Sequence, residues 1–288
     1  MIAVSRNARR GVTPVEVLVL VLIVSAVAMF VLTIIPRSRD SARLNGCNAN
    51  LMRIGEAMIQ SDAAQNHLPG IPPAGQPGPG PLAELAQQFG LAWFEGGTLA
   101  KAPAPGPIPP RRVQGFVCLA DPHLIRPDPD PAPVSYRANA GPGATGTGGP
   151  FAFGATTSIR DAEKAAGQDF TAAFAERLMG SGTAIPSVAN DYRSLNGPLG
   201  DEPCAGGDWR GDAGSSWASS GWRSTLYNHT LKPNETPSCI AADGKTARMG
   251  ASSLHENRVN VLMLGGSVRG FTSRVDRLVW RKFGGTSK

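Results

Sequence analysis

A single carboxylate, Glu16, stands between a basic N-terminal stretch and 19 consecutive uncharged residues, 17–35. An ionisable group costs about 3 kcal/mol at the centre of an apolar membrane helix and less near its end, so it is usually retained for a partner. Cleavage of the peptide bond after Gly11 would give Val12 a free α-amine. That amine is a natural partner for Glu16, in the same chain or in a neighbouring copy. The pattern therefore predicts proteolytic processing followed by ion pairing.

Two other groups of residues have types that could support chemistry. Ser252, Ser253 and His255 combine hydroxyls with a base, but no G-x-S-x-G turn accompanies them, so hydrolysis is not expected. We expect His255 to be a hydrogen-bonded structural residue. Asp128 and Asp130 could contribute to a calcium site, which needs six to eight oxygens. Prolines at alternate positions around them favour a rigid, solvated loop instead.

Four cysteines, Cys47, Cys118, Cys204 and Cys239, are consistent with an oxidising compartment. They allow three pairings, which the sequence does not decide, and four free thiols are a further alternative. Cys204 with Cys239 is the simplest local bridge, and Cys47 would then tie an N-terminal helix to Cys118. Because no two cysteines form a C-x-x-C pair, zinc is not expected, and we assign no metal-binding residues.

The apolar segment 12–35 would form about 36 Å of helix, enough to cross a bilayer core of about 30 Å. We predict a membrane-spanning helix over 12–36, with Pro36 ending or kinking it. A secretory signal peptide cut after Ala28, a plain single-pass anchor and a buried soluble helix are the alternatives. Apolar residues continue beyond Ala28, which argues against the signal peptide.

The remaining elements must form a head that carries the other candidate residues. A helix over 37–66 has an apolar stripe of Leu44, Cys47, Leu51, Ile54 and Met58, which we expect to pack on that head. Prolines and glycines crowd residues 69–150, indicating exposed connections. The segment 162–179 reads as a helix, and 208–222 as a Trp-rich loop whose aromatic side chains pack on the head.

A β-hairpin is predicted near the C-terminal end, where two apolar runs flank Gly265 and Gly266. Glycine tolerates the positive φ that a two-residue type I′ turn requires. The formal charge of +6 does not indicate a nucleic-acid partner, because no basic stripe is interleaved with aromatics, which make up 6% of the chain. Neither a P-loop nor a dinucleotide fingerprint is present, so no cofactor is expected.

The stretch from Arg10 to Glu16 resembles the type IV prepilin processing site: a basic leader ending in glycine, an apolar first mature residue and glutamate at mature position five. The resemblance implies cleavage after Gly11 by a prepilin peptidase, N-methylation of Val12, a leader inside the cell and a head outside it. Val12 and Pro14 stand where phenylalanine and leucine are more usual.

Several downstream segments resemble the prepilin-like DUF1559 (SBP_bac_10) family of planctomycetes. His255 followed by Gly265 and Gly266 resembles its C-terminal H-x9-D-G feature, with Gly265 in place of aspartate. The resemblance implies a pilin-like architecture and no known catalysis. The other matching segments are Cys47–Gly55, Phe116–Pro122, Ser135–Gly141, Tyr227–His229, Pro233-Asn234 and Cys239.

Together these observations predict an α+β, pilin-like fold: a leader over 1–11, a membrane helix over 12–36, its stalk continuation over 37–66 and a head over 67–288 with an antiparallel sheet. The expected protein is a non-enzymatic pseudopilin of a type II secretion or type IV pilus-like assembly. It would sit in the cytoplasmic membrane with its head in the periplasm or outside the cell. Its expected partners are the prepilin peptidase/methyltransferase, other pilin-like subunits and the lipid bilayer. The alternative is a membrane-anchored envelope binding module that does not polymerise and uses the loop 208–222 as its contact surface.

Overall fold

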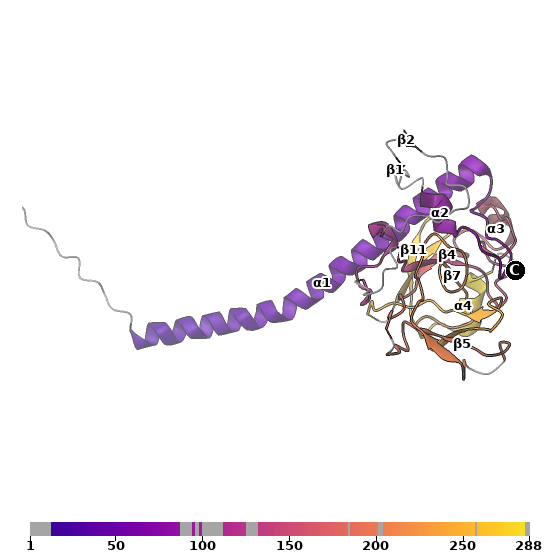
Figure 1. Cartoon of the computed structure of the whole chain (residues 1–288). Helices are drawn as coiled ribbons and strands as arrows, with labels where there is room; N and C mark the ends of the chain where they lie inside the picture. The colour runs from indigo at the N-terminus through magenta and orange to yellow at the C-terminus, as the bar shows by residue number, and fades with distance from the viewer. Residues whose placement is uncertain are drawn as a thin grey trace, which may run out of the picture. The chain divides into compact units, whose positions relative to one another are not determined.

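A computed structural model describes residues 13–86, 94–95, 98–99, 112–124, 132–183, 185–200, 204–256 and 258–285. It shows a mixed α+β protein whose sheets are mainly antiparallel, which confirms the α+β class and the antiparallel pairing that the sequence predicted (Figure 1). The predicted leader over 1–11 lies outside the described residues, as do Asp128 and Asp130.

The helices are α1 (Pro14–Gln65), α2 (Pro81–Leu85), α3 (Ile159–Ala165) and α4 (Arg277–Phe283), with a short 3-10 helix η2 (Gln114–Phe116). The strands are β1 (Phe94–Glu95), β2 (Thr98–Leu99), β3 (Tyr136–Asn139), β4 (Ala172–Glu176), β5 (Tyr192–Ser194), β6 (Asp208–Arg210), β7 (Leu226–Tyr227), β8 (Ser238–Ile240), β9 (Ala247–Arg248), β10 (Val259–Met263) and β11 (Val268–Phe271).

Helix α1 is one continuous element of 52 residues, so Pro36 does not end it as predicted. It ends at Gln65, and Asn66 follows with a φ of 60°. Asparagine tolerates this left-handed conformation better than most residues and commonly follows a helix C-terminus. The end of the helix therefore agrees with the predicted boundary at residue 66.

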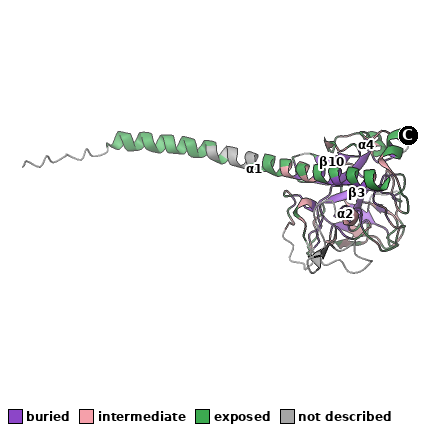
Figure 2. Ribbon diagram, turned by 90° about the horizontal axis from the view of Figure 1, so that it is seen from above, coloured by how far each residue is buried: buried purple, intermediate pink, exposed green. Residues whose placement is uncertain are grey.

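The chain divides into two units, Met1–Ala42 and Arg43–Lys288. In the first, the described large apolar side chains of α1 are solvent-exposed, from 46% at Val19 to 72% at Leu32 (green in Figure 2). Across the part of the chain that the structure describes, no helix combines the length and the apolar character needed to cross a bilayer.

In the second unit, a five-stranded sheet has the order β11-β10-β4-β3-β7 and a four-stranded sheet the order β6-β5-β8-β9. The pairs β3–β7 and β5–β8 are parallel, and the other pairs in these sheets are antiparallel. The short pair β1–β2 is antiparallel as well. Strands β3, β4 and β10 are buried along their whole length, so the five-stranded sheet forms the centre of the core (Figure 2).

The C-terminal half of α1 packs on this sheet, as its apolar stripe predicts. Leu51, Ile54 and Met58 have no exposed surface. Gly55 allows the close approach: a Cβ at this position would lie 2.9 Å from Leu262 Cδ1 on β10. The glycine that weakens the helix is thus explained by helix–sheet packing.

The predicted helix over 162–179 is wrong beyond Ala165, and the helix begins earlier, at Ile159. Helix α3 ends at Ala165, and Gly167 has a φ of 92°, which stops the helical conformation. The chain then forms β4, whose alanines are buried in the middle of the sheet. Pairing with β3 and β10 on either side therefore overrides the helical preference of alanine.

The predicted hairpin is confirmed as β10–β11, but its turn differs from the prediction. Gly266 N–H donates to the Met263 carbonyl, and Met263 N–H donates to the Ser267 carbonyl. The loop therefore has three residues, Leu264 to Gly266, and only Gly266 has a positive φ, of 86°. This is a turn followed by a left-handed glycine, another common hairpin connection.

Candidate functional site

The predicted processing residues are only partly visible. Gly11 and Val12 lie outside the described residues, while Glu16 lies in the first turn of α1. Its Oε2 accepts hydrogen bonds of 2.8 Å from both Thr13 N and Thr13 Oγ1, and Thr13 Oγ1 accepts one of 3.3 Å from Glu16 N. This reciprocal arrangement is a capping box, with Pro14 at the first helical position. The T-x-x-E spacing in the sequence is the signal that identifies it.

Both disulfides are formed, in the pairing suggested as simplest. Cys47 is bonded to Cys118 with Cα atoms 5.2 Å apart, and Cys204 to Cys239 with Cα atoms 5.6 Å apart. Cys47 lies on α1 and Cys118 directly after η2, so the first bridge fixes the helix to the head. In the loop-closure model each bridge contributes about 4 kcal/mol to stability.

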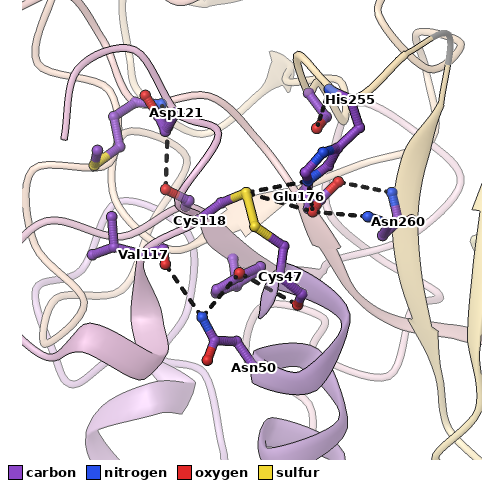
Figure 3. Close-up of a disulfide and its surroundings, with 12 residues drawn as sticks. Cys47, Asn50, Val117, Cys118, Asp121, Glu176, His255 and Asn260 are labelled. Carbon is purple, nitrogen blue, oxygen red and sulfur yellow. Dashed lines mark hydrogen bonds and ion pairs between the residues drawn. A yellow bond between two sulfur atoms is a disulfide. The ribbon is translucent and has the colours of Figure 1, made fainter. Parts of the chain in front are cut away.

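A buried ion pair lies against the Cys47–Cys118 bridge (Figure 3). His255 Nε2 lies 3.1 Å from Glu176 Oε1 and 3.4 Å from Cys118 Sγ, and Glu176 Oε1 lies 3.7 Å from the same sulfur. The side chains of His255 and Glu176 are 4% and 2% exposed. This disulfide is therefore in contact with a base and an acid in a place shielded from water.

Strand pairing in the central sheet positions the carboxylate. Glu176 is the last residue of β4, and Asn260 lies on the adjacent strand β10. Asn260 donates to both carboxylate oxygens, from its backbone N to Oε2 at 2.9 Å and from Nδ2 to Oε1 at 3.0 Å. A buried carboxylate is tolerated when its lone pairs are satisfied in this way.

The other side of the bridge is fixed by hydrogen bonds to α1. Asn50 Nδ2 donates to the Val117 carbonyl at 3.3 Å and lies 3.4 Å from the Tyr136 hydroxyl. Tyr136 in turn donates to the Cys47 carbonyl at 3.4 Å. Residues far apart in the sequence thus hold both cysteines in place (Figure 3).

Asp121 and Arg177 are a second pair of buried charged residues in the head. Burial raises the pKa of the Asp121 carboxyl, although it accepts hydrogen bonds from Met179 N at 2.8 Å and Ser135 Oγ at 3.1 Å. Burial also lowers the pKa of Arg177 to about 10, against the opposing charges of Asp191 and Asp121. Arg177 donates to the Gly250 carbonyl at 3.2 Å, so it joins segments of the core.

The serines near His255 have structural partners. Ser252 Oγ accepts from Leu178 N at 3.1 Å and from Arg177 NH1 at 3.3 Å. Ser253 Oγ accepts from His255 N at 3.3 Å, while the imidazole Nε2 faces Glu176. His255 therefore has the hydrogen-bonded environment expected of it, and its ring does not activate either hydroxyl.

His229 is fully buried in the head. Its Nδ1 lies 2.8 Å from the Trp280 carbonyl, and its Nε2 lies 3.1 Å from the Tyr227 hydroxyl. Because a carbonyl can only accept, Nδ1 carries the proton and Nε2 accepts from the tyrosine. Its ring stacks on Trp280 with centroids 4.0 Å apart. Burial lowers the pKa of His229 to about 3, so the imidazole is neutral.

The glycine that replaces the expected aspartate of the H-x9-D-G feature faces another carboxylate. A Cβ at Gly265 would lie 2.7 Å from Asp169 Oδ1. Gly265 does not adopt a positive φ, so its role is to leave space for Asp169 rather than to relieve the turn. The prediction that both glycines are needed by the turn is therefore wrong for Gly265.

The Trp-rich loop does not form an exposed contact surface. Trp217 and Trp222 are each 2% exposed, and Trp209 is partly covered by Arg193, whose guanidinium carbon lies 4.5 Å from its ring centroid. The aromatics pack on the head, as one reading of the sequence predicted. Trp209 is therefore the partly exposed tryptophan of the loop on which the binding-module alternative relied.

Sequence reasoning missed Glu176 and Asn260. Glu176 lies within the segment predicted as helix, and neither residue belongs to a recognisable motif. The expectation that no zinc binds was based only on the spacing of the cysteines along the chain. In space, one ligand atom from each of Cys47, Cys118, Glu176 and His255 lies within 4.8 Å of the others.

A comparison with protein families finds one family whose model matches a continuous part of the chain. The model of SBP_bac_10, described as protein of unknown function (DUF1559), matches residues 110–278, more than half of the chain. Searches of curated proteins and of solved structures found no match. The match includes Cys118, Glu176, His255 and the β10–β11 hairpin. The chain therefore belongs to the DUF1559 (SBP_bac_10) family.

Proposed function

We propose that this protein is a non-enzymatic, prepilin-like subunit that is cleaved after Gly11, methylated at Val12 and assembled with other pilin-like subunits through α1. The observation that carries the proposal is the unequal burial along this one helix. From Val15 to Leu32 its described large apolar side chains are exposed, whereas Cys47, Leu51 and Ile54 are buried.

The exposed half is too apolar to remain in water. Its large side chains form a continuous apolar surface around the helix, and such a surface marks a contact with another apolar phase. Lateral packing against the same segment of neighbouring copies would cover it. A type II secretion or type IV pilus-like fibre has this arrangement. The apolar side chains of the second half of α1 are already packed in the head. This half would hold the head at the fibre surface.

Glu16 has two possible partners in this proposal, used at different stages. In the single chain its carboxylate caps the first turn through Thr13. After cleavage, the α-amine of Val12 in the same or an adjacent subunit offers an opposite charge. An ion pair inside an apolar bundle is favourable only when both charges find partners, so it would select the register of neighbouring helices.

The cellular setting follows from the same proposal. The subunit would be held in the cytoplasmic membrane before assembly, with its leader inside and its head in the periplasm or outside. The prepilin peptidase/methyltransferase and lipid are its expected partners at that stage. The two disulfides support an oxidising compartment for the head, because such bonds persist outside the reducing cytosol.

The decisive experiment is N-terminal sequencing and intact-mass measurement of the full chain purified from its native cells. We expect a mature N-terminus at Val12 carrying one added methyl group. The same preparation should contain high-molecular-weight assemblies in sedimentation and electron microscopy. An uncut leader, or a start after Ala28, would overturn the proposal, as would a protein that is processed at Val12 but remains monomeric.

A further inference from the structure

We propose that the Cys47–Cys118 bridge has a second state: once it is reduced, the two thiolates, Glu176 and His255 bind a divalent cation of the zinc type. The four groups come from four separate places in the chain: α1, the segment after η2, the end of β4 and the loop before β10. All four are buried, with residue exposures of 0, 4, 1 and 7% respectively.

The distances between these groups fit a single cation. Zinc bonds of about 2.3 Å to sulfur and about 2.0–2.1 Å to nitrogen or oxygen place tetrahedral ligand atoms about 3.3–3.8 Å apart. The observed separations are 3.4 Å from Cys118 Sγ to His255 Nε2 and 3.1 Å from His255 Nε2 to Glu176 Oε1. Figure 3 shows these side chains directed toward the same point beside the sulfurs. The ligand atoms of Cys118, His255 and Glu176 therefore need to shift by only a few tenths of an ångström, and opening the S–S bond separates Cys47 Sγ from Cys118 Sγ.

The ligand types are also appropriate for zinc. Two thiolates, one imidazole nitrogen and one carboxylate oxygen complete a tetrahedral set and favour a borderline-soft ion over calcium or magnesium. Four protein ligands in a buried site leave no open position, which is typical of a structural site. The cation would offset the negative charge of the thiolates and Glu176, which are otherwise costly to bury.

A second layer of contacts already orients the ligands. Asn260 Nδ2 donates to Glu176 Oε1 at 3.0 Å, and its backbone N donates to Oε2 at 2.9 Å. His255 N donates to Ser253 Oγ at 3.3 Å, which fixes the loop that presents the ring. Such outer contacts typically contribute about 10–100-fold to metal affinity.

The chemical steps balance when a reductant is supplied. A dithiol or phosphine provides two electrons and the medium two protons, which convert the disulfide into two thiols. Binding of the cation then releases two protons as the thiols become thiolates. Metal and disulfide use the same sulfurs, so they are mutually exclusive, and bound zinc should slow reoxidation of Cys47 and Cys118.

The other cysteine pair supplies an internal control for the test. The full chain is reduced with a phosphine, incubated with or without one equivalent of Zn²⁺ and treated with an alkylating reagent. Peptide mass spectrometry then measures the alkylation of each cysteine. We expect zinc to slow alkylation of Cys47 and Cys118 at least about tenfold, as for a thiolate held by a metal. Cys204 and Cys239 should react equally fast in both samples.

Variants and a second metal probe test whether the proposed ligands cause the protection of Cys47 and Cys118 from alkylation. Co²⁺ added to the reduced chain should give the visible bands of tetrahedral thiolate-bound cobalt at one equivalent. His255→Gln and Glu176→Gln should lose both the protection and these bands, whereas His67→Gln should keep them. Asn260→Ala should weaken Co²⁺ binding about 10–100-fold without changing the stoichiometry.

Each remaining outcome has a defined meaning. Equal protection of all four cysteines, or no protection, overturns the proposal. The proposal is also overturned if zinc still protects Cys47 and Cys118 in His255→Gln and Glu176→Gln, because the metal ligands would then lie elsewhere. If reduction unfolds the chain, circular dichroism should show that Zn²⁺ restores the native spectrum, and failure to restore it counts against the site. The oxidised chain should bind no equivalent of Co²⁺. None of these results depends on cleavage after Gly11 or on fibre assembly.

Discussion

The two halves of α1 differ in both apolar content and environment. Leu20 is 64% exposed and lies in the unit Met1–Ala42, while Leu51 has no exposed surface and lies in the unit Arg43–Lys288. The second half is held by a disulfide and by the central sheet. The first half is capped at its N-terminal end by Thr13 and Glu16, and its described large apolar side chains are exposed. The comparison shows that one helix can combine a part that completes a folded core with a part that needs an external partner.

The largest expected effect comes from making the same substitution in both halves. Leu51→Ala should lower the free energy of unfolding of the head by about 2–5 kcal/mol, because it leaves a cavity in a packed core. Leu20→Ala should change it by less than about 0.5 kcal/mol. Chemical denaturation followed by tryptophan fluorescence measures both, since all five tryptophans lie beyond residue 90. Equal effects would show that the two halves do not differ in this way.

An intermediate effect is expected from acid, acting on the head alone. The pKa of His229 is lowered to about 3 in the folded state against 6.5 in the unfolded state. The unfolded chain therefore takes up a proton below about pH 6.5 that the folded chain does not. Stability is present above that pH and is lost as the pH falls toward 3. Between pH 7 and 5 the loss should be about 2 kcal/mol.

The control for this pH effect is a second histidine. His229→Gln should reduce the slope of stability against pH in this window, whatever it does to stability at pH 7, and His67→Gln should retain the slope. Denaturant titrations at a series of pH values give the slopes. An unchanged slope in His229→Gln would assign the acid sensitivity to other groups.

The smallest effect on stability, with the sharpest effect on assembly, is expected at Glu16. Glutamine can replace glutamate in a capping box, so Glu16→Gln should keep the helix start and the stability of the head. It removes the charge that would pair with the Val12 α-amine, and the fraction of protein in sedimenting assemblies should fall. Glu56→Gln, at an exposed position of the same helix, is the matched control. Normal assembly of Glu16→Gln would reduce the role of Glu16 to capping.

Elements with a strong local signal could be predicted from the sequence. The stripe containing Leu51 and Ile54 gave the buried face of α1, and the glycines at 265 and 266 located the hairpin. The Trp-rich loop was correctly expected to pack inward. In each case the residue pattern over a short window carries the physical cause.

The rest depended on contacts between distant segments. β4 consists largely of alanines, which favour helix by local propensity, and its strand conformation comes from pairing with β3 and β10 on either side. Glu176 and His255 are 79 positions apart, and neither has a neighbour that marks it as part of an ion pair. Gly265 is determined by Asp169, on a different segment. Local propensity contains no information about such pairs, so they cannot be read from the sequence.

The contacts of α4 also have a consequence for the order in which the protein matures. Asn139 at the end of β3 donates to the Gly284 carbonyl at 3.0 Å, and His229 stacks on Trp280. The Asn139 side chain and the His229 ring therefore meet these partners only after α4 has been synthesised, long after α1 and β3. Contacts of such high sequence separation slow folding. The core is thus completed last at its C-terminal end, after every strand of the five-stranded sheet has been made.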